Sequence, residues 1–132
     1  MKVDHIGIAV RSLDSALRAY AAIGLRPEAT ESVQSEGVTV AFLRVGDAHL
    51  ELLEPLGPDT VIARFLDKRG EGLHHVALAV DDIRASMEQA RRNGLAVIDE
   101  TPRLGARGRE VAFVHPKSTG GVLLEFVQHP RE

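Results

Sequence analysis

Two histidines and two glutamates hold matching positions in the two halves of this 132-residue chain. His5 and His75 each head an apolar run, and the second run follows the first by 70 residues. Glu51 and Glu125 each lie within the last apolar run of their half. Two imidazoles and two carboxylates form a borderline-hard ligand set, suited to an octahedral divalent ion that keeps positions open for water or substrate. These ligand types are compatible with cobalt, nickel, manganese, iron and zinc, and do not identify the metal.

The alternation of side chains along a strand selects between the two neighbouring histidines of the second half. His75 shares its phase with Ala77, as His5 shares its phase with Gly7, whereas His74 falls in the apolar phase of the strand. We therefore predict that His75 is the ligand. Three other histidines have no counterpart in the repeat and are expected to be surface or packing residues: His49, His115 and His129.

Each of the four residues also has a simpler interpretation. A single histidine at the start of a strand is more often a hydrogen-bonded structural residue than a ligand. A glutamate on a strand usually faces solvent on the open side of an antiparallel sheet. The repeat favours the metal site, because two histidines and two glutamates in matched places are improbable as four separate accidents.

The elements that must position these residues follow from hydrophobic periodicity and turn residues. In the first half we expect a strand at 3–10, a helix from the Ser12 cap to Gly24, an edge strand at 26–35 and a hairpin of 38–45 with 48–54. A linker at 55–59 and a helix at 61–70 follow. The second half repeats this order, with a strand at 73–80, a helix at 83–94, an edge strand at 95–100, a loop at 102–108 and strands at 111–115 and 122–128. In a sheet that curls around a cleft, the first and last strands of each half would bring a histidine to a glutamate.

The composition limits the classes of partner and compartment. The net charge is -3 with both signs interspersed, so the chain lacks the basic face that binds nucleic acid. The absence of cysteine excludes disulfides and thiolate ligands and is compatible with the cytoplasm. No apolar run approaches the roughly 20 residues of a membrane span, and residues 1–10 do not resemble a signal peptide. We expect a cytoplasmic protein that binds neither membrane nor nucleic acid.

These residues resemble the vicinal oxygen chelate superfamily, which includes glyoxalase I, extradiol dioxygenases and antibiotic-resistance proteins. Within it, four segments are similar to the methylmalonyl-CoA epimerase family, at residues 4–10, 51–56, 65–75 and 115–125. The last segment is the most specific, because other members of the superfamily do not share its run His115-Pro116-Lys117-Ser118.

The resemblance implies an α+β fold of two fused βαβββ modules, which form a curled eight-stranded mixed sheet around a metal cleft. Module 1 would span about residues 1–56, a linker helix about 57–70 and module 2 about 71–132, within one domain. The metal ligands would be His5, Glu51, His75 and Glu125, and the ion foremost cobalt, with nickel, manganese or zinc as alternatives.

The activity that the resemblance implies is epimerisation of methylmalonyl-CoA at C2, through a metal-stabilised enolate. Glu51 and Glu125 would exchange the proton, since epimerisation needs a base on one face of the carbon and an acid on the other. The turn at Lys117 and Ser118 is expected to touch the substrate carboxylate or thioester. A homodimer is also expected from the resemblance and from the exposed edges of an open sheet.

One departure leaves other reactions open. Several epimerases carry a glutamate three residues after the glycine that corresponds to Gly37, whereas this chain has Val40. In those members the position of Glu51 is often glutamine. The ligand set of two histidines and two glutamates also resembles bacterial glyoxalase I, which is the alternative function. A third, from another class, is a metal-free small-molecule-binding protein of the same fold.

Overall fold

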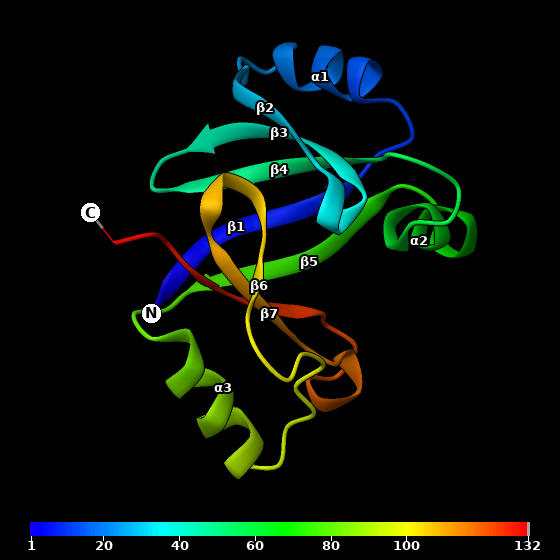
Figure 1. The fold of residues 1–132 in the computed structure, drawn as a ribbon. Coiled ribbons are helices and arrows are strands. Elements are labelled where there is room, and N and C mark those ends of the chain that lie inside the picture. The colour runs from blue at the N-terminus through cyan, green and yellow to red at the C-terminus, as the bar shows by residue number, and fades with distance from the viewer. Residues whose placement is uncertain (132) are drawn as a thin grey trace. The chain divides into compact units, whose positions relative to one another are not determined.

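The computed structural model describes residues 1–131, which divide into two compact units. The N-terminal unit comprises His5–His74, and the C-terminal unit comprises Met1–Asp4 together with the described residues from His75 onward. The first strand of each half runs through a unit boundary. Parallel and antiparallel strand pairs both occur, and the predicted α+β fold of two βαβββ modules is confirmed (Figure 1).

The N-terminal unit contains four strands in the order β2-β3-β4-β1. The elements are β1 (Lys2–Ala9), α1 (Leu13–Ala21), β2 (Pro27–Val33), β3 (Val38–Val45), β4 (Ala48–Pro55) and α2 (Val61–Arg69). β1 pairs with β4 in parallel, and β3 pairs antiparallel to both β2 and β4. Parallel pairing requires a long crossover connection between the two strands, which α1 and the strands after it provide.

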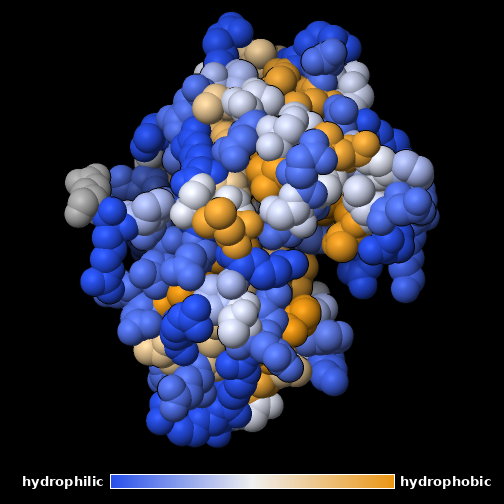
Figure 2. All heavy atoms as spheres, viewed as in Figure 1, coloured by the Kyte–Doolittle hydropathy of each residue, from blue (hydrophilic) through white to orange (hydrophobic). Residues whose placement is uncertain are grey.

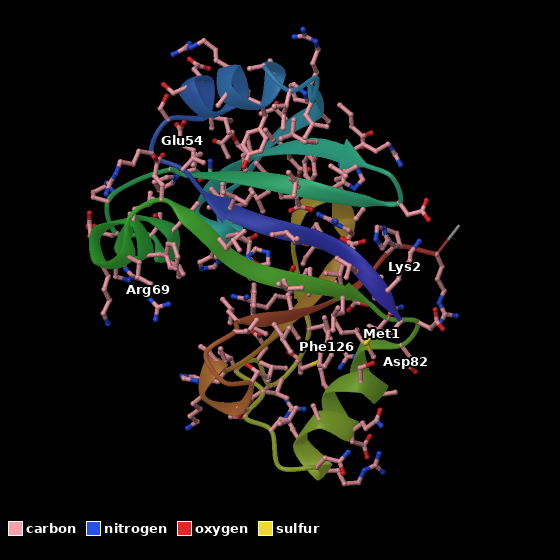
Figure 3. The ribbon with its side chains drawn as sticks, turned by 180° about the vertical axis from the view of Figure 1, so that it is seen from behind. Met1, Lys2, Glu54, Arg69, Asp82 and Phe126 are labelled. Carbon is pink, nitrogen blue, oxygen red and sulfur yellow. The ribbon has the colours of Figure 1, made fainter. Side chains whose placement is uncertain are left out.

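Two side chains fix where α1 begins. The hydroxyl of Ser12, the predicted cap, accepts the backbone N–H of Ser15 at 3.2 Å. The carboxylate of Glu54, at the end of β4, accepts the backbone N–H of Leu13 at 2.6 Å. In Figure 3 Glu54 accordingly lies at the start of this helix. Both contacts satisfy N–H groups that a helix cannot bond internally, and the negative charge suits the positive end of the helix.

Alternation along the strands gives the sheet of the N-terminal unit two distinct faces. Apolar residues of one phase form a core with α1: Ile8, Ala41, Leu43, Leu50 and Leu52 pack with Leu13, Ala16, Leu17 and Tyr20. The opposite phase carries His5 on β1 and Glu51 on β4. We call this second side the open face of the N-terminal unit.

The C-terminal unit repeats the arrangement in the order β5-β8-β7-β6. Its elements are β5 (Gly72–Ala79), α3 (Ile83–Arg92), β6 (Arg103–Leu104), β7 (Glu110–Val114) and β8 (Leu124–Gln128). β5 pairs with β8 in parallel and β7 pairs with β8 antiparallel. Ile83, Met87 and Ala90 of α3 form a core with Ala112, Val114 and Phe126, and Figure 3 shows Phe126 among the side chains near this helix.

The predicted edge strand at 95–100 is wrong. Val97 makes only an isolated bridge to Val114, and the short strand β6 lies instead within the segment predicted as a loop. The reason is Asp99, whose carboxylate accepts the backbone N–H of Phe113 at 2.8 Å and pairs with Arg103 at 2.9 Å. A side chain thus takes the place of a ladder carbonyl and ends the pairing at this point.

The surface is mostly hydrophilic on the face seen in Figure 2, with apolar residues in small groups among the polar ones. No helix of residues 1–131 combines the length and the apolar character that crossing a membrane requires.

Candidate active site

The N-terminal unit pairs His5 with Glu51 on its open face. Nδ1 of His5 lies 3.1 Å from Oε2 of Glu51, and the two side chains are only 3% and 5% exposed. The parallel register sets Gly7 of β1 opposite Glu51, two residues after the histidine. Because Gly7 has no side chain, the imidazole and the carboxylate meet diagonally across the two strands.

The C-terminal unit repeats this pairing with His75 and Glu125. Nε2 of His75 lies 3.5 Å from Oε1 of Glu125, and both side chains are buried. The register partner of Glu125 is Ala77, again a small residue two positions after the histidine. The rings of Phe113 and His75 pack perpendicular to each other with centroids 5.6 Å apart. Both halves therefore build a histidine–carboxylate pair from a parallel strand pair, through Nδ1 of His5 in one half and Nε2 of His75 in the other.

The donor groups of these two pairs fit a divalent cation. All four side chains are of types that bind metal ions, and all four are buried. A buried carboxylate is costly unless a partner compensates its charge, and a cation provides that compensation. Imidazole nitrogen with carboxylate oxygen suits first-row divalent ions such as cobalt, nickel, manganese and zinc.

His74, the neighbour that alternation assigns to the other phase, packs against α2. Its ring meets the ring of Phe65 edge to face, with centroids 4.9 Å apart. Burial lowers the pKa of His74 from 6.5 to about 4, because the charged imidazolium is poorly solvated there. His74 is therefore neutral near pH 7 and serves packing.

Two of the three histidines expected to be surface or packing residues, His129 and His49, pair with carboxylates. Nε2 of His129 lies 2.5 Å from Oδ1 of Asp4, whose other oxygen accepts from Nη1 of the buried Arg109 at 3.0 Å. Nε2 of His49 lies 2.8 Å from Oε1 of Glu28. His49 precedes Glu51 by two residues, so strand phase alone already placed it on the same face as the proposed ligand.

Val40 is buried at 2% exposure on β3, where its register partner is Leu53. It has the phase of Phe42, the partner of Glu51, so it also belongs to the open face. An apolar side chain at this position cannot carry a proton. Any acid or base on this part of the face must come from a neighbouring residue.

The Lys117-Ser118 turn forms a short 3-10 helix, Pro116–Ser118. The Ser118 hydroxyl accepts the backbone N–H of Ala96 at 2.9 Å, and the backbone N–H of Lys117 donates to Nδ1 of His115 at 3.0 Å. Two structural hydrogen bonds thus fix the turn, and the Lys117 side chain is exposed.

Comparison with known proteins identifies the family. The model of the glyoxalase/bleomycin resistance protein/dioxygenase superfamily matches residues 4–113. The chain belongs to this superfamily. It is 38% identical over 130 residues to human mitochondrial methylmalonyl-CoA epimerase, covering 96% of this chain and 73% of that protein. It is 39% identical over 128 residues to the uncharacterized protein YqjC of Bacillus subtilis, covering 96% and 91%.

Solved structures and a more distant relative complete the comparison. A variant of Streptomyces coelicolor methylmalonyl-CoA epimerase in complex with 2-nitronate-propionyl-CoA superposes with a TM-score of 0.95 at 37% identity, covering 98% of this chain and 94% of that one. A methylmalonyl-CoA epimerase in complex with methylmalonyl-CoA and NH4+ gives 0.94 at 37% identity, covering 97% and 94%. The lactoylglutathione lyase of Haemophilus influenzae is 28% identical over 134 residues, covering 98% and 93%. The resemblance to methylmalonyl-CoA epimerases inferred from the sequence is confirmed.

Proposed function

We propose that this protein interconverts the two C2 epimers of methylmalonyl-CoA with the help of one divalent cation. The enzyme class follows from its relatives, since methylmalonyl-CoA epimerases align with nearly the whole chain in sequence and in structure. The observation that carries the mechanism is the buried histidine–glutamate pair repeated in each half.

His5, Glu51, His75 and Glu125 are the proposed ligands of a single ion, with cobalt as the first candidate and nickel, manganese or zinc as alternatives. The support is chemical, because each half supplies one imidazole nitrogen and one carboxylate oxygen of the same buried kind. When bound, a divalent cation supplies Lewis acidity to the thioester and carboxylate oxygens of the substrate.

Glu51 and Glu125 are the proposed proton carriers. The C2 hydrogen of methylmalonyl-CoA lies between two carbonyl groups, and its removal needs a base near neutral pH. Each carboxylate has a histidine nitrogen beside one oxygen, at 3.1 Å on Oε2 of Glu51 and 3.5 Å on Oε1 of Glu125. We propose that one glutamate takes the proton from one face of C2 and the other returns a proton to the opposite face.

Exchange with solvent tests this function directly. Metal-loaded protein in deuterium oxide should incorporate deuterium at C2 of methylmalonyl-CoA, as measured by mass spectrometry, and protein stripped by a chelator should lose that activity until a divalent ion is restored. Metal-loaded protein that leaves C2 unlabelled would end the proposal.

Lys117 and Ser118 are proposed to contact the acyl end of the substrate. The support is the fixed turn with an exposed ammonium group, which matches an anionic carboxylate. Replacing Lys117 with methionine should raise KM for methylmalonyl-CoA with a smaller effect on the propionyl-CoA dissociation constant, since propionyl-CoA lacks the carboxylate.

Glyoxalase I remains the second candidate function. The similarity to the Haemophilus influenzae lactoylglutathione lyase favours it, together with a ligand set of two histidines and two glutamates. Turnover of the hemithioacetal of methylglyoxal and glutathione decides between the two, and failure with that substrate removes the alternative. A metal-free binding role is tested by metal analysis of protein prepared without chelators.

We also propose a cytoplasmic homodimer. The outer strand β2 of the N-terminal unit exposes most of its residues, and such an edge favours burial against a second copy. Light scattering coupled to size-exclusion chromatography measures the mass in solution.

A further inference from the structure

A polar cluster lies beside the His5–Glu51 pair on the open face of the N-terminal unit. Its members are His49 on β4, Arg44 on β3 and Glu28 on β2. Oε1 of Glu28 lies 2.8 Å from Nε2 of His49, and Oε2 accepts from Nε of Arg44 at 3.0 Å. The proposed catalytic mechanism gives these three residues no role.

Strand register places His49 next to both His5 and Glu51. His49 is the register partner of His5 across β1 and β4, and it shares its side of β4 with Glu51. Residues two apart on a strand are spaced by roughly 7 Å. The His49 ring also lies perpendicular to the ring of Phe42, the register partner of Glu51, with centroids 6.4 Å apart.

A β-bulge brings Glu28 to this face. The β2–β3 register shifts between Pro27 and Ala29, which pair with Leu43 and Phe42. Without the shift, Glu28 would alternate with Ala29 and point to the α1 side. Bulges re-aim side chains and are frequent beside active sites.

The contact with Glu28 also orients the His49 ring. A carboxylate only accepts hydrogen bonds, so Nε2–H donates and Nδ1 of the neutral ring is left as an acceptor. Nδ1 makes no hydrogen bond to any group within residues 1–131, and the His49 side chain is 15% exposed. An acceptor held in this way suits an N–H donor from a bound molecule.

We propose that His49 binds the substrate by accepting the N–H of the first pantetheine amide of an acyl-CoA thioester. The chain C2–C1–S–CH2–CH2–N places that amide nitrogen five bonds from C2, the carbon that Glu51 is proposed to deprotonate. An extended linkage of this length covers the roughly 7 Å between positions 51 and 49 of β4. Glu28 and Arg44 are positioning residues that hold the imidazole. This inference rests on the proposed function only in taking an acyl-CoA as the ligand.

Two amide substitutions separate binding through Nδ1 from a structural role of the ring. In His49→Asn the amide presents an acceptor near the Nδ1 position, whereas in His49→Gln it reaches the Nε2 position and keeps only the contact with Glu28. We expect KM for methylmalonyl-CoA to rise about fivefold in H49Q, as for the loss of one hydrogen bond, with kcat almost unchanged. H49N should stay within about twofold of the wild type. Two results would overturn the proposal: an H49Q variant with the KM of the wild type, or an H49N variant whose KM rises more than that of H49Q.

A truncated substrate supplies the control. The S-ethyl thioester of methylmalonic acid lacks the amide, so wild type, H49N and H49Q should share one KM for it. The same fivefold penalty on this thioester would show that His49 acts elsewhere. Glu28→Ala should reproduce the H49Q effect on the CoA thioester, while Glu28→Gln, whose amide oxygen still accepts, should restore much of the affinity.

Direct binding keeps this test independent of the proposed reaction. Calorimetry with propionyl-CoA should show the same loss of affinity in H49Q, at a metal content equal to the wild type. A protein that binds propionyl-CoA in this way but does not exchange the C2 proton would refute the epimerase proposal and keep the role of His49. No binding of propionyl-CoA by the wild type, or loss of metal in proportion to affinity, would refute the role of His49.

Discussion

Glu51 faces Gly7 across the parallel strands β1 and β4, and this register brings its carboxylate 3.1 Å from the imidazole of His5. The same relation joins Glu125 to Ala77 on β5 and β8. In both cases the residue opposite the carboxylate is small, which leaves the diagonal between glutamate and histidine open. The site chemistry therefore depends on a backbone register as much as on the ligands themselves.

The adjacent histidines of β5 offer a matched pair of substitutions. His75→Phe should lose bound metal and at least 100-fold in exchange activity, because it removes one proposed ligand. His74→Phe keeps an aromatic ring against Phe65 and should retain the metal. Elemental analysis after dialysis, together with the deuterium assay, measures both effects. Equal metal contents in the two variants would show that His75 is not a ligand.

Substrates of a single C2 configuration test whether Glu51 and Glu125 each act on one face of C2. Glu51→Gln and Glu125→Gln should each slow proton exchange, by 100-fold or more when the missing group is the base. If each glutamate serves one face of C2, each variant should slow the incorporation of solvent deuterium at C2 more for one epimer of the substrate than for the other. Identical losses for both epimers in both variants would mean that a single group carries the proton on both faces.

Burial of His74 makes stability depend on pH. The unfolded chain protonates this imidazole below about pH 6.5, whereas the folded protein does so only near pH 4. The unfolded state therefore binds more protons in this window, and the free energy of unfolding falls as pH drops through it. Urea unfolding of His74→Phe should show a shallower decline between pH 6.5 and 4 than the wild type. Parallel curves would assign the decline to other groups.

The buried ion pair of Arg109 and Asp4 should be costly to break. Its side chains are 5% and 8% exposed, and Nη1 of Arg109 lies 3.0 Å from Oδ2 of Asp4. Arg109→Met leaves a buried carboxylate poorly compensated and should lower the free energy of unfolding by about 3 kcal/mol. Asp4→Asn in the same chain should recover part of that loss, as a double-mutant cycle in urea measures. Simple additivity of the two substitutions would contradict a coupled pair.

The core of the C-terminal unit offers a test that is independent of the site. Met87 of α3 is 1% exposed among Ala112, Val114 and Phe126. Met87→Ala should lower the free energy of unfolding by about 3 kcal/mol, through lost burial and the cavity left behind. The exposed neighbour Glu88 is the matched control, and its change to alanine should stay within about 0.5 kcal/mol. Similar effects of the two substitutions would place Met87 outside the core.

The sequence by itself determined most of the elements and the repeat, because alternation and helical caps are local. The phase of His5 with Gly7, the phase of His75 with Ala77 and the cap at Ser12 all follow from neighbours within a few residues. The four proposed ligands were likewise named from matching positions in two copies. Their roles stay predictions, but the histidine–glutamate pairing within each half is visible in the structure.

The tertiary structure decided what depends on register between strands. Asp99 ended an expected strand by bonding the backbone of Phe113, an interaction across 14 positions of sequence. His49, expected to be a surface or packing residue, lies opposite His5 through the pairing of β1 with β4, and a bulge turns Glu28 toward it. Alternation fixes which side of a strand a residue takes. Only the pairing of strands fixes which distant residue it meets there.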